Sequence, residues 1–180
     1  MNINELFGVS GKVAIVTGGS RGIGEMITSG FLANGVKVYI TARKEGPLIE
    51  KAKELSKKYE GDCIPIACDL SSTIGANYFV KKILKHEKGI DFLINNAGAA
   101  WGEPFKSFSE SGWDKVMDLN VKSLFFLTQK LTDLLKVNGT KEDPSRVINI
   151  GSIDGLNVPA FETYSYSTSK AAVHRLTRVL

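Results

Sequence analysis

Tyr166 and Lys170 stand four residues apart in the last amphipathic stretch of the chain. On a helix this spacing places two side chains on one face. A free phenol ionises only at about pH 10, but a neighbouring ammonium stabilises the phenolate. Tyr166 could therefore act as a general acid toward a carbonyl, or as a base toward an alcohol. The hydroxyl of Ser152, which follows a short apolar run, could hydrogen-bond the reacting oxygen.

Asn120 stands between Leu119 and Val121 in an apolar helical stretch, where an amide needs a hydrogen-bonding partner. Tyr and Lys at this spacing also occur by chance in many helices, so the pair needs support from its surroundings. His86 and His174 have no partner at metal-ligand spacing and are expected to be ordinary helix residues. We expect no metal site.

The segment 17–24, TGGSRGIG, joins an apolar run to an amphipathic one. Glycines permit a tight turn there and leave room for a pyrophosphate beside the N–H groups of a helix N-terminus. The spacing GxxxGxG differs from the usual GxGxxG, and many such turns only reverse the chain. The residues that would contact a dinucleotide here are Gly18, Ser20, Arg21, Gly22, Ile23 and Gly24.

The end of the second apolar run distinguishes between the two nicotinamide cofactors. A site for an unphosphorylated ribose usually has an acidic residue at this point. Here the chain reads Ile40-Thr41-Ala42-Arg43-Lys44, without a carboxylate. Arg43, with Arg21 opposite, would bind a 2′-phosphate, which favours NADP(H). The alternative is that both arginines are ordinary surface residues.

Two further strand ends carry candidate cofactor contacts. Asp69 could accept a hydrogen bond from an adenine amino group, with Leu70 beside it, or Asp69 could simply cap the next helix. Asn96, Ala97 and Gly98 follow the fourth strand, where small residues allow the chain to pass close to a flat ligand. The asparagines could equally tie neighbouring loops together.

The periodicity predicts five strands that alternate with helices. The expected strands are 12–17, 36–43, 63–70, 90–98 and 146–152. The expected helices are 22–35, 47–61, 73–87, 111–137 (with a bend near its start) and one from 164 to the end. The unbroken apolar strands predict a parallel sheet buried on both faces, and Pro65 places the third strand at an edge. The fold class is therefore α/β, a doubly wound, Rossmann-like, three-layer sheet.

Composition excludes several classes of protein. With 180 residues, 43% of them hydrophobic, the chain is expected to form a single domain. It contains no apolar run of roughly 18–20 residues, and its first residues lead us to expect no secretory leader. The net charge of +4 is dispersed, which argues against a nucleic-acid partner. Cys63 and Cys68 are expected to be reduced core thiols, which favours a cytoplasmic location.

Taken together, the motifs resemble the short-chain dehydrogenase/reductase family. They are TGGSRGIG (17–24), CDL (68–70), NNAG (95–98), LNV (119–121), IGS (150–152) and YSTSK (166–170). The resemblance implies a catalytic tetrad of Asn120, Ser152, Tyr166 and Lys170 and hydride transfer with NADP(H). It also implies that Tyr166 and Lys170 contact the cofactor, Lys170 through the nicotinamide ribose, and that Asn120 holds a proton-relay water.

Within the family the chain looks most like the NADPH-dependent 3-oxoacyl reductases of the rhamnolipid-synthesis type. The segments NNAGAAWG, SGWDKVMDLNV, DPSRVINIGS and YSYSTSKAAVHRLTRVL carry this likeness. Relatives that act on polyols, sugar acids or other small ketones share the same motifs, so these substrates remain an alternative. Trp101, Leu156, Val158 and Phe161 could line a pocket for an acyl chain, or they could cover the core.

Complete family members continue beyond the helix that carries Tyr166, with two more strands and a substrate loop. The resemblance thus implies a Rossmann-like domain over 1–180 that lacks the last strands, and we expect the 180-residue form to be unstable or inactive. It also implies a homodimer or homotetramer formed through helices 111–137 and 163–180. The alternatives from another class are a nucleotide-binding scaffold without chemistry and a fragment that serves only as a dimerisation partner.

Overall fold

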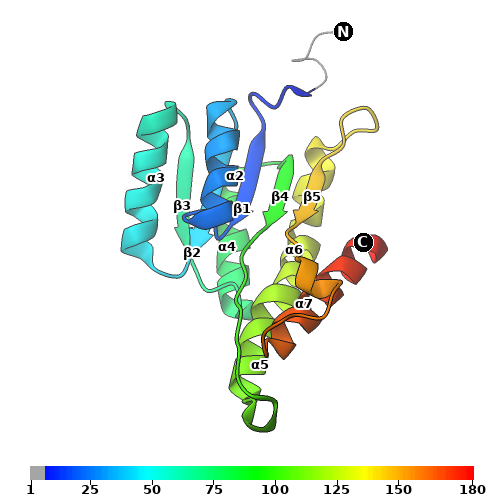
Figure 1. Cartoon of the computed structure of the whole chain (residues 1–180). Helices are drawn as coiled ribbons and strands as arrows, with labels where there is room; N and C mark the ends of the chain where they lie inside the picture. Colours follow the sequence, from blue (N-terminus) through cyan, green and yellow to red (C-terminus); the bar gives the residue numbers. More distant parts are fainter. Residues whose placement is uncertain (1–6) are drawn as a thin grey trace.

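Five short apolar runs form a parallel sheet at the centre of the structure, a computed structural model that describes residues 7–180 (Figure 1). The strands are β1 (Val13–Thr17), β2 (Lys37–Ala42), β3 (Cys63–Ala67), β4 (Phe92–Asn95) and β5 (Arg146–Asn149). Their order across the sheet is β3-β2-β1-β4-β5, so the direction of winding reverses between β1 and β4. The predicted doubly wound, Rossmann-like fold is confirmed.

Helices cover both faces of this sheet (Figure 1). They are α2 (Gly22–Ala33), α3 (Glu45–Tyr59), α4 (Thr73–His86), α5 (Glu110–Met117), α6 (Ser123–Asn138) and α7 (Tyr164–Val179). The chain also forms two short 3-10 turns, η1 (Phe105–Ser107) and η3 (Ile153–Gly155). α2 and α3 pack on one face of the sheet, whereas α4 and α6 pack on the other.

Two hydrophobic cores result, one on each side of the sheet. Successive side chains of a strand point to opposite faces, so an unbroken apolar strand supplies both cores. In β1, Ala14 and Val16 belong to the core beneath α2 and α3, whereas Ile15 belongs to the core beneath α4 and α6. All three side chains are fully buried, which fixes β1 as the central strand.

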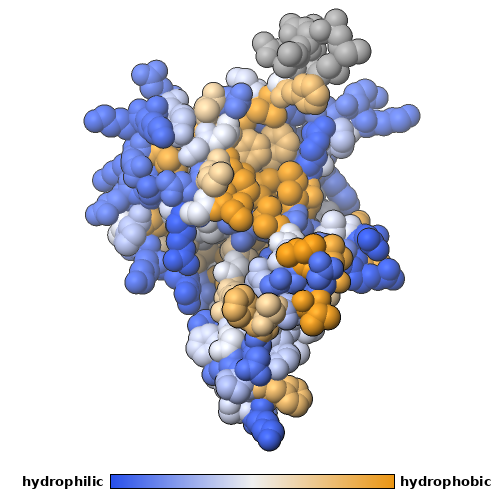
Figure 2. All heavy atoms as spheres, in the orientation of Figure 1, coloured by the Kyte–Doolittle hydropathy of each residue, from blue (hydrophilic) through white to orange (hydrophobic). Residues whose placement is uncertain are grey.

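The two edge strands differ in how well the sequence predicted them. β3 lies at one edge, as Pro65 indicated, because proline cannot donate a ladder hydrogen bond. β5 lies at the other edge, and the prediction that every strand is buried on both faces is wrong there. Val147 and Ile148 are 37% and 43% exposed. Figure 2 shows hydrophobic atoms gathered at the surface over the part of the sheet that holds β4 and β5.

The predicted long helix 111–137 is interrupted. α5 ends at Met117, a wide π-type turn (η2, Asp118–Lys122) follows, and α6 continues to Asn138. A π-turn inserts one extra residue per turn into the i→i−4 ladder, and such turns are frequent at functional sites. The interruption thus lies in the stretch that contains Asn120, farther along than the bend expected near the start.

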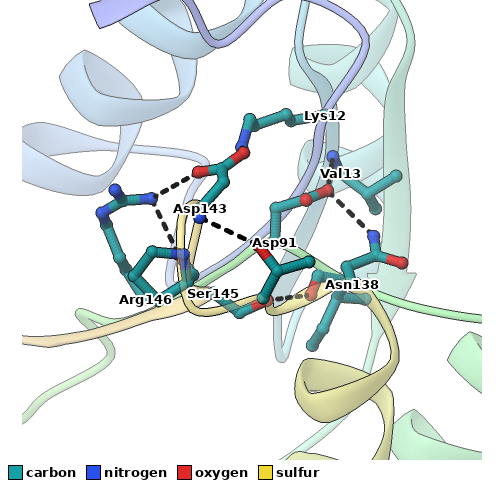
Figure 3. Close-up of polar contacts among 10 residues, drawn as sticks. Lys12, Val13, Asp91, Asn138, Asp143, Ser145 and Arg146 are labelled. Atoms are coloured by element: carbon teal, nitrogen blue, oxygen red, sulfur yellow. Dashed lines mark hydrogen bonds and ion pairs between the residues drawn. The ribbon is translucent and has the colours of Figure 1, made fainter. Parts of the chain in front are cut away.

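A polar cluster joins the amino ends of the strands, which lie at the opposite end of the sheet from the glycine turn (Figure 3). Asp91, which precedes β4, accepts hydrogen bonds from the backbone N–H of Val13 at 2.8 Å and from the Asn138 amide at 3.1 Å. Lys12 forms an ion pair with Asp143 in the loop before β5. This hydrogen-bonded ion pair holds the pKa of Asp143 below its ordinary value. The cluster joins β1, β4 and the α6–β5 loop.

Candidate active site

A glycine turn connects β1 to α2 and requires glycine for two different reasons. Gly18 has a φ of +65°, a backbone conformation that L side chains rarely adopt. Gly24 stands in the first turn of α2, where a Cβ would lie 2.2 Å from the carbonyl oxygen of Gly18. The residue preceding α2, Arg21, makes no side-chain capping bond, so the first N–H groups of this helix remain available to an anion.

The end of β4 is tied to this turn through Thr17 and Asn96. The buried Oγ1 of Thr17 accepts hydrogen bonds from the backbone N–H groups of Asn96 and Ala97, each at 2.9 Å. The Asn96 side chain donates in return to the carbonyl oxygens of Thr17 at 2.8 Å and Gly18 at 3.2 Å. These bonds cross the point where strand order reverses, the place at which open α/β sheets bind ligands. The structural role foreseen for the asparagines is present.

A cavity of about 770 Å³ opens above this point, at the carboxyl ends of the strands. Ten of the predicted cofactor residues line it: Gly18, Ser20, Arg21, Ile23, Gly24, Arg43, Leu70, Asn96, Ala97 and Gly98. Gly22, Asp69, Tyr166 and Lys170 do not belong to its lining. The cavity is therefore one continuous site assembled from the ends of β1, β2, β3 and β4.

The positive charge of the cavity comes from three exposed side chains. Arg21 lies in the glycine turn, whereas Arg43 and Lys44 follow β2. No salt bridge engages Arg21 or Arg43 within residues 7–180, so both guanidinium groups are available to an anionic ligand. Lys44 is a site residue that the sequence analysis did not single out, although it adjoins Arg43.

Asp69 does not cap α4, so that alternative is wrong. Its carboxylate accepts hydrogen bonds from the backbone N–H of Ser71 at 3.0 Å and from the Ser71 hydroxyl at 2.7 Å. The N-cap of α4 is Ser72, whose hydroxyl accepts from the N–H of Gly75. The reason is distance along the chain, because an N-cap must immediately precede the first helical residue, here Thr73.

Sequence reasoning missed six further cavity residues besides Lys44. They are Thr41, Ala42, Pro47, Leu48, Cys68 and Leu119. Cys68 was expected to be a core thiol, but it is only partly buried and lies 3.0 Å from the Thr41 hydroxyl. Thr41 and Cys68 lie at the carboxyl ends of β2 and β3, so the rule that ligands bind at these ends was the available signal.

Asn120 lies in the π-turn η2 and joins three segments. Its Oδ1 accepts from the backbone N–H of Ala99 at 2.8 Å, and its Nδ2 donates to the Ala99 carbonyl at 2.9 Å. The same Nδ2 donates to the Ser169 hydroxyl on α7 at 2.9 Å. The amide is buried and satisfied, as the sequence analysis required. It fixes α7 relative to the chain that leaves β4.

Tyr166 and Lys170 face each other on α7, with the Lys170 Nζ 5.7 Å from the centre of the Tyr166 ring. Lys170 is 7% exposed and donates a 2.6 Å hydrogen bond to the carbonyl oxygen of Ile150, just after β5. Burial lowers the pKa of Lys170 from its ordinary value, because desolvation disfavours the charged form. An ammonium held in this way stabilises negative charge on the neighbouring phenol oxygen.

Ser152 immediately precedes the η3 turn and caps it, because its Oγ accepts from the backbone N–H of Asp154 at 3.2 Å. This bond uses a lone pair and leaves the hydroxyl proton free to be donated to a substrate oxygen. The turn packs against α7, where a Cβ on Gly155 would lie 2.6 Å from the backbone carbon of Lys170. Ser152, Tyr166 and Lys170 thus belong to two packed segments beside the end of β5.

The apolar residues proposed for an acyl pocket lie differently. Leu156, Val158 and Phe161 are exposed, so the expectation that they cover the core is wrong. Trp101 packs on α5, where a Cβ on Gly112 would lie 2.2 Å from the indole nitrogen. The Lys115 ammonium stands 4.0 Å from the centre of the Trp101 ring, a cation–π contact. Trp101 therefore anchors the loop after β4 to α5.

No group of three or more His, Cys, Asp or Glu side chains within residues 7–180 could hold a metal ion. The helices of the described chain fall short of the length and apolar content that a membrane span requires.

The arrangement combines a glycine turn over a basic cavity with a facing tyrosine–lysine pair at the carboxyl edge of a doubly wound sheet. The family model of the short chain dehydrogenases matches residues 12–180. The chain belongs to this family. The match extends over all five strands and over α7.

Three known proteins illustrate the likeness. The rhamnolipids biosynthesis 3-oxoacyl-[acyl-carrier-protein] reductase of Pseudomonas aeruginosa is 45% identical over 174 residues, which are 97% of this chain and 67% of that protein. The solved Pseudomonas aeruginosa RhlG/NADP active-site complex matches 96% of this chain and 67% of its own, at 45% identity and a TM-score of 0.92. L-sorbose reductase from Gluconobacter frateurii, complexed with NADPH and L-sorbose, matches 96% of this chain and 64% of its own, at 28% identity and a TM-score of 0.88. This chain spans about two thirds of the length of these relatives.

Proposed function

We propose that the protein is an NADPH-dependent oxidoreductase that interconverts a carbonyl and an alcohol. The observation that carries the proposal is the buried Lys170 ammonium facing the Tyr166 ring after the end of β5, at the same carboxyl edge of the sheet as the glycine-lined cavity. Such a pair supplies a proton donor for a carbonyl oxygen. A scaffold that only bound a nucleotide would not need it.

The cavity fits a dinucleotide cofactor. Its volume of about 770 Å³ lies within the range of roughly 300–1,000 Å³ that is typical of cofactor sites. The uncapped N-terminus of α2 and the turn at Gly18 and Gly24 would hold the pyrophosphate. Arg43 and Arg21, with no carboxylate at the end of β2, would hold a 2′-phosphate. The relatives solved with NADP and NADPH support this assignment.

Each residue of the candidate tetrad has a separate role in the proposed reduction. Bound NADPH would supply a hydride to the substrate carbon. Tyr166 donates its phenolic proton to the carbonyl oxygen as that oxygen gains negative charge, and Lys170 stabilises the resulting phenolate. Ser152 donates a hydrogen bond to the same oxygen and so orients it. Asn120 holds α7 in register with the loop after β4 and would bind the water that relays the proton.

A 3-oxoacyl thioester is the substrate that we propose. The support is the 45% identity to a 3-oxoacyl-[acyl-carrier-protein] reductase over 97% of this chain. A second candidate, a sugar or polyol ketone, is favoured by the likeness to L-sorbose reductase. The exposed Leu156, Val158 and Phe161 form an apolar segment beside Ser152, which suits an acyl chain better than a polyhydroxylated one.

The decisive experiment compares a purified form that carries the two further strands and the substrate loop of complete family members with its Tyr166→Phe variant. Oxidation of NADPH is followed at 340 nm with a 3-oxoacyl thioester and, separately, with L-sorbose. Loss of a general acid should lower the turnover number by about 10²–10⁴-fold while NADPH binding, measured by fluorescence, remains. Unchanged turnover in the variant would exclude Tyr166 as the proton donor. Faster turnover of L-sorbose than of the thioester would favour the second candidate.

We further propose a homodimer or homotetramer formed through α5, α6 and α7. Trp113 on α5 and Phe126 on α6 are exposed aromatic side chains, which are enriched at protein interfaces. Light scattering coupled to gel filtration tests this assembly, and a purely monomeric mass at micromolar concentration would reject it.

We also propose a cytoplasmic location. Cys63 and Cys68 are free thiols, the state expected in a reducing compartment. Fractionation of cells that produce the protein tests the location, and recovery in an exported fraction would contradict it.

A further inference from the structure

His174 contacts the backbone on both sides of Ser152. It stands one helical turn after Lys170 on α7, so the two side chains lie on the same face. Its Nε2 lies 2.9 Å from the carbonyl oxygen of Ser152. A carbonyl oxygen only accepts hydrogen bonds, so Nε2 must carry the hydrogen and donate it. The sequence analysis had treated this histidine as an ordinary helix residue.

Two glycines make room for the imidazole ring. A Cβ on Gly151 would lie 2.7 Å from His174 Cε1, and one on Gly155 would lie 2.8 Å from His174 Cδ2. Neither glycine has a positive φ, so backbone conformation does not demand glycine at these positions. At Gly151 the requirement is space for the ring, whereas at Gly155 it is space for the ring and for the α7 backbone at Lys170 and Ala171. The ring thus lies in a slot between the chain entering the η3 turn and the chain leaving it.

The hydrogen bond from His174 acts on the residue that orients the substrate oxygen. The Ser152 carbonyl accepts one other hydrogen bond in the described chain, from the N–H of Gly155 at 3.1 Å. The hydrogen bonds from His174 and Gly155 together restrict rotation of the peptide group that follows Ser152. The Ser152 Oγ in turn accepts from the N–H of Asp154, which belongs to the same turn. Any rotation of the turn therefore moves the serine hydroxyl.

Two neighbouring hydrogen bonds also join α7 to the end of β5 and the chain that follows it. Lys170 donates to the carbonyl of Ile150 at 2.6 Å, and Asn149 donates to the hydroxyl of Thr177 at 3.0 Å. On α7, His174 lies between Lys170 and Thr177. It bonds Ser152, the residue of the segment 149–152 that orients the substrate oxygen in the proposed reaction. Without it, no hydrogen bond within the described residues would join Ser152 to α7.

We propose that His174 is a positioning residue for carbonyl reduction, which holds the Ser152 hydroxyl in place by bonding the Ser152 carbonyl. It does not contact the substrate, and the proposal rests on the proposed function of Ser152. His174→Gln and His174→Met form a matched pair, because the two side chains have similar size and only glutamine can donate.

The expected result separates positioning from packing. His174→Met should lower the turnover number about tenfold, the effect of one net hydrogen bond on a rate, with the KM for NADPH unchanged. His174→Gln should stay within about threefold of the parent protein. Equal losses in both variants, or no loss in His174→Met, would overturn the proposal.

Hydrogen exchange gives a readout that does not depend on activity. The backbone amides of Asp154 and Gly155 should exchange faster in His174→Met than in His174→Gln, because the turn loses its tether. If the parent protein reduces no carbonyl with NADPH, the proposed function fails while this comparison still decides whether the tether exists. Equal exchange in the two variants would show that the bond does not hold the turn.

Double substitution tests the slot itself and covers the case in which His174→Met folds poorly. Gly151→Ala should lower turnover in the parent protein, because the new methyl group meets the ring, but should cost little more in a His174→Ala background. Additive losses would contradict the assigned contact.

Discussion

Thr17→Val isolates the hydrogen bonds that tie the glycine turn to the end of β4. Valine preserves the size of the side chain but removes the buried oxygen that accepts from the N–H groups of Asn96 and Ala97. Asn96 N–H retains a second acceptor, the carbonyl of Ile94 at 3.0 Å, whereas Ala97 N–H has no other acceptor within residues 7–180. One unsatisfied donor costs about 1–3 kcal/mol, and the weakened bonds add roughly 1 kcal/mol. The free energy of unfolding should therefore fall by about 2–4 kcal/mol.

Urea unfolding followed by fluorescence measures this loss, with linear extrapolation to zero denaturant. Thr17→Ser is the matched control, because it keeps the hydroxyl and loses only a methyl group, which costs about 1 kcal/mol. The affinity for NADPH should also fall in Thr17→Val, since Asn96 and Ala97 line the cavity. A valine variant within about 0.5 kcal/mol of the parent, or no less stable than the serine variant, would refute the assignment.

Three further outcomes are expected. Arg43→Ala should raise the Kd for NADPH by about 10–100-fold in fluorescence titrations, because charged hydrogen bonds to the 2′-phosphate are lost. The Kd for NADH should stay nearly unchanged. Equal effects on both cofactors would contradict the assignment of Arg43 to the 2′-phosphate. Gly24→Ala should weaken NADPH binding, because its methyl group would meet the Gly18 carbonyl at 2.2 Å; wild-type affinity would show that the turn relaxes without cost. Lys170→Met should abolish carbonyl reduction. Because the folded chain holds the pKa of Lys170 below its ordinary value of 10.5, the unfolded chain binds more protons just below that pH, so the stability of the parent protein should rise with pH there. Urea unfolding at several pH values should show this contribution in the parent and not in Lys170→Met, and identical pH slopes would exclude it.

Features that depend on short stretches of sequence were predictable. The glycine turn, the apolar strands and the placement of Pro65 in an edge strand follow from local backbone preferences, and the structure confirms them. The facing arrangement of Tyr166 and Lys170 follows from helical spacing alone. These signals need no knowledge of how distant segments pack.

Features that depend on packing between distant segments were not predictable. The exposure of β5 depends on what packs against an edge strand, which its apolar sequence does not report. The role of His174 depends on two glycines about twenty residues earlier in the chain, and a lone histidine has no local signature of such a contact. The position of the wide turn at Asp118–Lys122 likewise depends on the bonds of Asn120 to Ala99 and Ser169.

That wide turn makes the chain sensitive to its length at this point. A π-turn closes its hydrogen bonds over five residues where an α-turn uses four, so deleting one residue from Asp118–Lys122 would restore an ordinary helix and leave α6 in nearly its present orientation. Leu127 and Leu131 would keep their places in the core, but Asn120 would swing away from Ala99. A single-codon deletion here should therefore lower activity far more than stability, because the core contacts survive and the bonds of Asn120 do not.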